Sequence, residues 1–159
     1  MFDPEERRDR AVALFKEGYN CAQSVVLAFE DLIPAADKDA VVRMSSSFGG
    51  GISRLREVCG AVSGMAIIEG FCEGYSTPET GIAKSEFYAK VQKLALEFEK
   101  RNGSVVCRDL LGLPAGHSSP DATPRTPQFY DQRPCPKVIG DAALILAEYL
   151  NEISYGGAK

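Results

Sequence analysis

The sequence lacks the features of several protein classes. No stretch reaches the roughly 18 apolar residues that a membrane span requires, so no transmembrane helix is expected. The first residues, MFDPEERRDRAVALF, show no basic segment followed by an apolar core, and we therefore expect a cytoplasmic protein without a secretory signal. A net charge of −4 gives no general attraction to nucleic acid or to an anionic membrane.

Cysteine and histidine are sparse. Five cysteines in 159 residues are too few for a disulfide scaffold, and an odd number cannot pair completely within one chain. No two are spaced Cys-x-x-Cys, which disfavours a thioredoxin-type dithiol and a zinc ribbon. The single histidine, His117, lies in a polar segment and is interpreted as a solvated loop residue. Any cysteine site must therefore be assembled from distant segments.

The apolar residues that are present recur at helical spacing. With 45% hydrophobic and 25% charged residues, the chain suits one compact domain, 1–159. We predict an all-α, single-domain bundle of about six to seven helices. The expected helices are about 4–17, 20–33, 35–48, 55–73, 77–102, 104–112 and a last one from Cys135. The start signal of the long fifth helix is Thr77-Pro78-Glu79. Residues 113–134, rich in proline and polar side chains, are expected to form an irregular surface excursion.

Glycines flank one of the cysteines. The run Gly49, Gly50 and Gly51 lacks the Gly-Lys-Ser/Thr ending of a phosphate loop, and so its expected use is to bend the backbone around Cys59 or a cofactor held there. The small residues that follow, from Gly60 to Gly64, would let a helix or a ligand approach closely. The candidate cofactor-binding residues are Gly49, Gly50, Gly51 and Gly60. Arg54 and Arg56 would favour a nearby thiolate electrostatically, or else form a solvated surface.

The positions of the cysteines point to thiolate chemistry. Cys21, Cys107 and Cys135 are expected at helix beginnings, and Cys59 in or near a first turn. Free amide groups and the helix dipole at such positions stabilise a thiolate. Cys72 differs, because about 20 Å of helix would separate it from Cys59, and we interpret it as a small buried hydrophobe.

Four segments together resemble a known family. YNCAQSVVLAF, FGGGISR ahead of CGAVSG, NGSVVCRDLLG and CPKVIGDAALILAEYL resemble, in this order, the C-GCAxxG-C-C family of proteins considered redox-active. The resemblance spans nearly the whole chain. It implies a helical domain with four signature cysteines, Cys21, Cys59, Cys107 and Cys135, that are redox-active or bind a cluster. Members are often encoded near transport genes.

Three functions stay open from the sequence. In the first, the four signature cysteines bind an iron-sulfur cluster for electron transfer, or a structural zinc ion. In the second, two of them form a reversible disulfide, with Cys59 as the attacking thiol and Cys21 as the other candidate catalytic residue. In the third, the cysteines only pack, and the chain is an interaction module for a transporter. A homodimer is compatible with all three.

Overall fold

The computed structural model describes residues 1–78 and 80–155 and confirms the all-α prediction. No strand occurs within these ranges. Six helices have eight residues or more: α1 Pro4–Glu17, α2 Cys21–Ala28, α3 Ala35–Ser45, α5 Gly60–Glu73, α6 Gly81–Asn102 and α9 Cys135–Glu152. Shorter helices are α4 Gly49–Ile52, α7 Cys107–Leu110 and α8 Pro127–Gln132, with 3-10 turns at Glu30–Leu32 and Ser46–Phe48.

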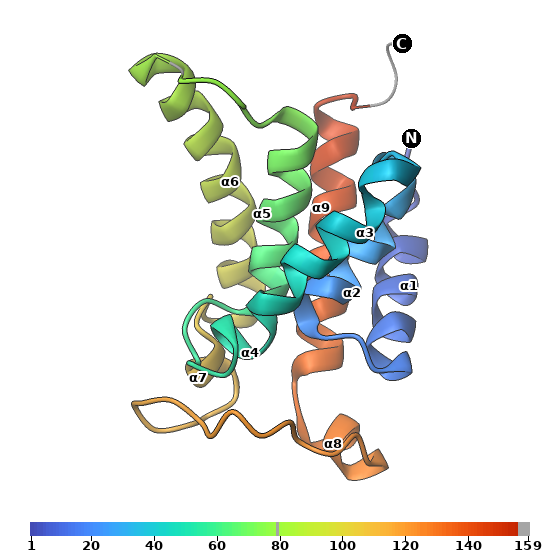
Figure 1. Cartoon of the computed structure of the whole chain (residues 1–159), viewed down its shortest axis with the longest axis vertical. Helices are drawn as coiled ribbons and strands as arrows, with labels where there is room; N and C mark the ends of the chain where they lie inside the picture. Colours follow the sequence, from blue (N-terminus) through green and yellow to red (C-terminus); the bar gives the residue numbers. More distant parts are fainter. Residues whose placement is uncertain (79, 156–159) are drawn as a thin grey trace.

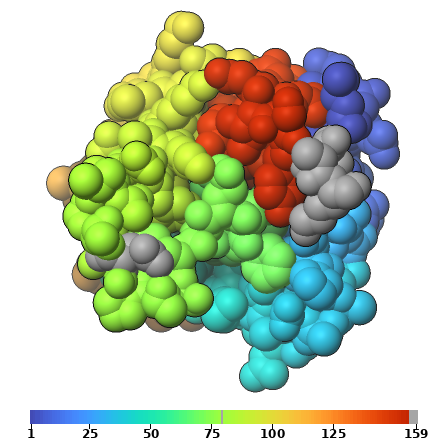
Figure 2. Space-filling model, turned by 90° about the horizontal axis from the view of Figure 1, so that it is seen from above, coloured from blue at the N-terminus to red at the C-terminus, as the bar shows by residue number. Residues whose placement is uncertain are grey.

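The long helices form a bundle with α9 near its middle. In Figure 1, α4, α7 and α8 gather at the end opposite the start of α1 and the end of α9. Figure 2 looks onto the end of α9 and shows α9 between α6 on one side and α1 on the other, in agreement with the contacts that α9 makes with both. Ten residues of α9 are buried, and the buried apolar side chains form one cluster that includes Cys59. Burial of each large apolar side chain stabilises the fold by about 1.5–3 kcal/mol.

Local signals explain where the first two helices begin. The Asp3 carboxylate accepts hydrogen bonds from the amides of Glu5 and Glu6, and Pro4 sets the first helical residue of α1. At the start of α2, the Asn20 side chain accepts from the Gln23 amide at 3.0 Å, and the Gln23 side chain accepts from the Asn20 amide at 3.2 Å. This capping box fixes the residue that follows Asn20, which is Cys21.

The small residues of α5 allow the close packing that the sequence predicted. A Cβ added at Gly64 would lie 2.8 Å from the Val25 Cβ and 3.0 Å from the Ala22 carbonyl oxygen. A Cβ added at Gly60 would lie 2.8 Å from the Phe48 carbonyl oxygen and 3.0 Å from the Cys21 Cβ. Helices α2 and α5 are therefore held together at backbone distance, with two cysteines at the same end.

Several predicted boundaries are wrong. The helix expected over 55–73 begins only at Gly60, because the preceding residues include Arg56 at φ 64° and pair with another segment. The second helix ends at Ala28 and continues as a 3-10 turn. The helix expected from 104 begins at Cys107, since the Ser104 hydroxyl caps a turn by accepting from the Val106 amide instead.

Two further boundaries lie in proline-containing segments. Helix α6 begins at Gly81 with Thr80 as its cap, not at Thr77, while Glu79 of the expected start signal lies outside the described residues. The excursion expected over 113–134 is irregular only as far as Thr126. There, the threonine side chain and the following proline begin α8, a start signal that the sequence already contained.

None of the helices described is both long and apolar enough to span a membrane.

Candidate functional site

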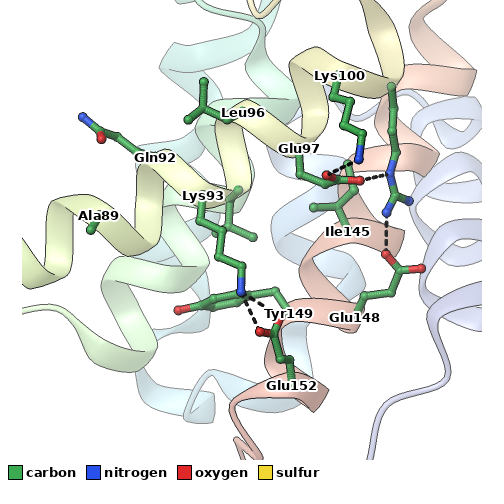
Figure 3. Close-up of a pocket in the computed structure, with 12 residues that line it drawn as sticks. Ala89, Gln92, Lys93, Leu96, Glu97, Lys100, Ile145, Glu148, Tyr149 and Glu152 are labelled. Carbon is green, nitrogen blue, oxygen red and sulfur yellow. Dashed lines mark hydrogen bonds and ion pairs between the residues drawn. The ribbon is translucent and has the colours of Figure 1, made fainter.

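A large cavity of the molecule carries no cysteine. It measures about 640 Å³ and lies between α6 and α9 (Figure 3). Its charged side chains pair with one another: Lys93 contacts Glu152 at 2.7 Å, and Arg101 contacts Glu148 at 2.7 Å and Glu97 at 2.8 Å. These charges are therefore neutralised by partners across the cavity, which leaves none of these groups free to bind a charged ligand.

Four cysteines from distant segments meet in one place. Cys21, Cys59, Cys107 and Cys135 all line a small cavity of about 20 Å³, which is closed by apolar neighbours such as Leu110. Cys21, Cys107 and Cys135 are the first residues of α2, α7 and α9, and Cys59 is the N-terminal cap of α5. At Cys59, hydrogen bonds from the Ala61 and Val62 amides in the first turn of α5 partly offset the effect of burial on its pKa.

Backbone pairing brings Cys59 beside Cys107. The Cys59 amide donates to the Val105 carbonyl oxygen at 2.8 Å, and the Cys107 amide donates to the Glu57 carbonyl oxygen at 2.6 Å. An isolated antiparallel bridge between Val58 and Val106 lies between these two bonds. The two cysteines thus flank the same short ladder, although 48 positions of the sequence separate them.

The glycine run makes room for the site. Gly50 and Gly51 adopt φ of 67° and 69°, and the left-handed conformation continues through Arg54. A Cβ on Gly51 would lie 2.8 Å from the Cys107 Cβ and 2.7 Å from the Glu57 amide nitrogen. The run therefore packs directly on the cysteine cluster. Its predicted role as a contact for a cofactor stays a prediction.

Cys21 and Cys135 interact with each other and are called here the Cys21–Cys135 pair. A hydrogen bond from the Cys135 thiol lowers the pKa of Cys21 to about 7, with further help from the Gly50 amide and the Arg125 guanidinium. The same hydrogen bond and burial raise the pKa of Cys135 well above its ordinary value. Near neutral pH the pair therefore holds one proton, on Cys135, and a thiolate at Cys21.

The other two cysteines of the cluster remain protonated. Cys59 is only 4% exposed, and burial raises its pKa to about 12. Burial also raises the pKa of Cys107, although the Arg56 guanidinium opposes this by donating to the Cys107 sulfur at 3.7 Å. Of the four thiols, Cys21 is the one poised as a nucleophile.

A wider chamber leads to the pair. This arginine chamber measures about 390 Å³. Its wall includes Cys21, Cys107 and Cys135 together with Arg54, Arg56, Arg125 and Arg133. Arg125 and Arg133 were not anticipated, because they lie in the segment predicted as a surface excursion. The available signal was that this arginine-containing segment directly precedes Cys135.

The two remaining candidates lie apart from the cluster. Cys72 is half-buried near the other end of α5, where a hydrogen bond links it to Tyr155. His117 is exposed in the loop before α8.

The sequence predicted a metal site at Cys21, Cys59, Cys107 and Cys135. Within residues 1–78 and 80–155, no group of three or more Cys, His, Asp or Glu side chains is arranged to hold a metal ion. The four cysteines share a cavity, and metal binding there would have to release their thiol protons. The metal centre stays a prediction.

Comparison with known families identifies the family of the chain. Residues 19–149 match the model of the C_GCAxxG_C_C family, described as "Putative redox-active protein". The chain belongs to this family. The match extends from two residues before Cys21 to the last turn of α9, so that all four cysteines of the cluster fall within it.

A relative from Archaeoglobus fulgidus is similar to this chain, but its description names no activity. It is 27% identical over 119 residues, which covers 69% of this chain and 77% of the relative, and it is described as "Uncharacterized protein". No solved structure matches the chain. These comparisons therefore give the family of the chain and no specific activity.

Proposed function

We propose that this family member is a thiol-disulfide redox protein in which Cys21 and Cys135 cycle between dithiol and disulfide. The observation that carries the proposal is the position of the two cysteines, which line both the small cavity of the cluster and the arginine chamber. The interaction with Cys135 also lowers the pKa of Cys21 to about 7. A low-pKa thiol with a neighbouring resolving thiol is the arrangement that disulfide exchange requires.

The exchange has two steps. The Cys21 thiolate attacks one sulfur of a substrate disulfide, and the substrate S–S bond breaks to release one thiolate. Cys135 then loses its proton to solvent and attacks the Cys21 sulfur, which releases the second substrate thiolate. The two cysteines lose two electrons, and the substrate disulfide gains them.

This assignment differs from the attacking thiol expected from the sequence. Cys59 was the expected attacking thiol because glycines surround it, but its sulfur is buried and its pKa is raised to about 12. Only about 1 in 10⁵ of its molecules would carry a thiolate at pH 7. We therefore propose Cys21 as the attacking thiol in its place.

A redox titration with single variants tests the proposal. The protein is equilibrated in graded glutathione buffers, the free thiols are trapped by alkylation, and the number of modified cysteines is read by mass spectrometry. Cys21→Ser and Cys135→Ser should each abolish the form that has lost two thiols, whereas Cys72→Ser should retain it. Loss of the oxidised form in Cys72→Ser alone would contradict the assignment.

A metal centre is the second candidate, favoured by the one cavity that all four sulfurs line. The residues that would hold the metal are Cys21, Cys59, Cys107 and Cys135, and iron with sulfide would supply electron transfer. Iron, zinc and acid-labile sulfide should be measured in protein purified without oxygen or chelator. One cluster per chain, lost in Cys59→Ser and Cys107→Ser, would favour this candidate over the dithiol.

A further inference from the structure

The thiol chemistry leaves the charge of the arginine chamber unexplained. Four arginines line it and, among the described residues, no aspartate or glutamate does. The chain as a whole carries a net charge of −4, so this concentration of positive charge is local. A chamber with walls of one sign concentrates ligands of the opposite sign.

The guanidinium groups are held mainly by neutral partners, and the Cys21 thiolate, which Arg125 favours, offsets only part of their charge. Arg56 is 4% exposed and donates to the Ser118 hydroxyl at 2.8 Å and to the Cys107 sulfur. Arg54 donates to the Ser119 carbonyl oxygen at 2.6 Å and to the Thr123 hydroxyl at 3.0 Å. These partners are neutral, and buried charge without a counter-ion is costly. Two acidic groups, Asp121 outside the chamber wall and Cys107 within it, oppose the lowering of the pKa of Arg54.

The other two guanidinium groups are held by aromatic rings. Arg125 lies over Phe15 at 4.4 Å and donates to the Phe15 and Tyr19 carbonyl oxygens at 3.3 Å. Arg133 lies 4.6 Å from the centre of the Phe129 ring. The positive charges also oppose one another, because Arg56 and Arg133 lower the pKa of Arg54 in addition to the effect of its burial. The chamber wall is therefore positively charged and favours a negatively charged ligand.

We propose that the arginine chamber binds a small anionic disulfide, one bearing carboxylate groups, and presents it to Cys21. This proposal rests on the proposed function and names its substrate class. The volume of about 390 Å³ lies in the range of small-molecule sites and leaves little room for a folded partner. Guanidinium groups bind carboxylates through paired hydrogen bonds. The substrate S–S bond then breaks as described above, and the two released thiols carry the carboxylates away.

Three disulfides that differ in charge test the substrate class. They are dithiodipropionate, which is anionic, hydroxyethyl disulfide, which is neutral, and cystamine, which is cationic. The rate of Cys21 modification by each is divided by the rate of the same disulfide with a free small thiol, which cancels intrinsic reactivity. At low salt the anionic compound should exceed the neutral one by about tenfold, and cystamine should be slowest. Equal corrected rates, or a faster cystamine, would overturn the proposal.

Charge-removing variants show whether the chamber is the cause. Arg133→Gln and Arg54→Gln should each lower the anionic-to-neutral rate ratio by about threefold. Arg43→Gln is the matched control, because it removes the same charge from an 81% exposed side chain on α3. If Arg43→Gln lowers the ratio as much as the chamber variants do, the effect belongs to net charge and the chamber proposal fails.

The two proposals can fail separately. Cys21→Ser cannot form the disulfide, yet it should still bind dithiodipropionate more tightly than hydroxyethyl disulfide in a calorimetric titration. Binding without exchange in the wild type would overturn the redox function but retain the anion site. Exchange without preference for the anion would overturn the anion site but retain the redox function.

Discussion

Removing the Cys135 thiol should change the acidity of Cys21. The Cys135 hydrogen bond is the largest of the effects that lower the pKa of Cys21 from 9.0 to about 7. In Cys135→Ala the pKa of Cys21 should therefore rise toward 9.0. If the shift is complete, the thiolate fraction at pH 7 falls from about one half to about one hundredth. A more basic thiolate is about tenfold more nucleophilic, and so the net loss of rate at pH 7 is about fivefold.

The assay is alkylation of Cys21 by iodoacetamide between pH 5.5 and 10, followed by mass spectrometry of the Cys21 peptide. The wild type should give a midpoint near pH 7, and Cys135→Ala should give a higher midpoint, with a slower rate at pH 7 and a faster one near pH 9.5. Cys72→Ala is the control and should follow the wild-type curve. If the midpoint of Cys135→Ala equals that of the wild type, the argument that the Cys135 thiol donates a hydrogen bond to the Cys21 sulfur is refuted.

Two further predictions concern the bundle. Burial raises the pKa of Glu69 to about 7, so its contribution to the free energy of unfolding falls as pH rises from 4.5 through 7. In urea unfolding, Glu69→Gln should therefore be about 1–3 kcal/mol more stable than wild type at pH 8 and similar to it at pH 5. No such gain would show that Glu69 keeps an ordinary pKa. Gly51→Ala should lose about 1–3 kcal/mol more than Gly112→Ala, because both have positive φ but an added Cβ meets other atoms only at Gly51. Equal losses in thermal unfolding would mean that contact with Cys107 is unimportant.

Local sequence signals were enough to place most of the helices. Asp3-Pro4 and the Asn20 capping box fixed the starts of α1 and α2, and Cys135-Pro136 marked the start of α9. These signals act within one helical turn, so a single sequence contains them. They also placed Cys21 and Cys135 at helix starts before their positions in space were known.

What the sequence did not reveal depends on long-range pairing. Residues 56–59 read as the start of a buried helix, but they bond instead to residues 105–108, which only the folded chain brings near. The same is true of Arg125, whose place beside the cysteine cluster depends on its stacking against Phe15 from α1. Because Cys21 and Cys135 meet only through such packing, their hydrogen bond and the resulting pKa could not be predicted.

The most direct test of the central claim is to map the disulfide in oxidised wild-type protein. Protein oxidised under mild, non-denaturing conditions is alkylated, digested without reduction and analysed by tandem mass spectrometry. The predicted result is one cross-linked peptide joining Cys21 to Cys135, with Cys59, Cys72 and Cys107 alkylated. A bond between Cys59 and Cys107 instead, or five alkylated cysteines, would contradict the account.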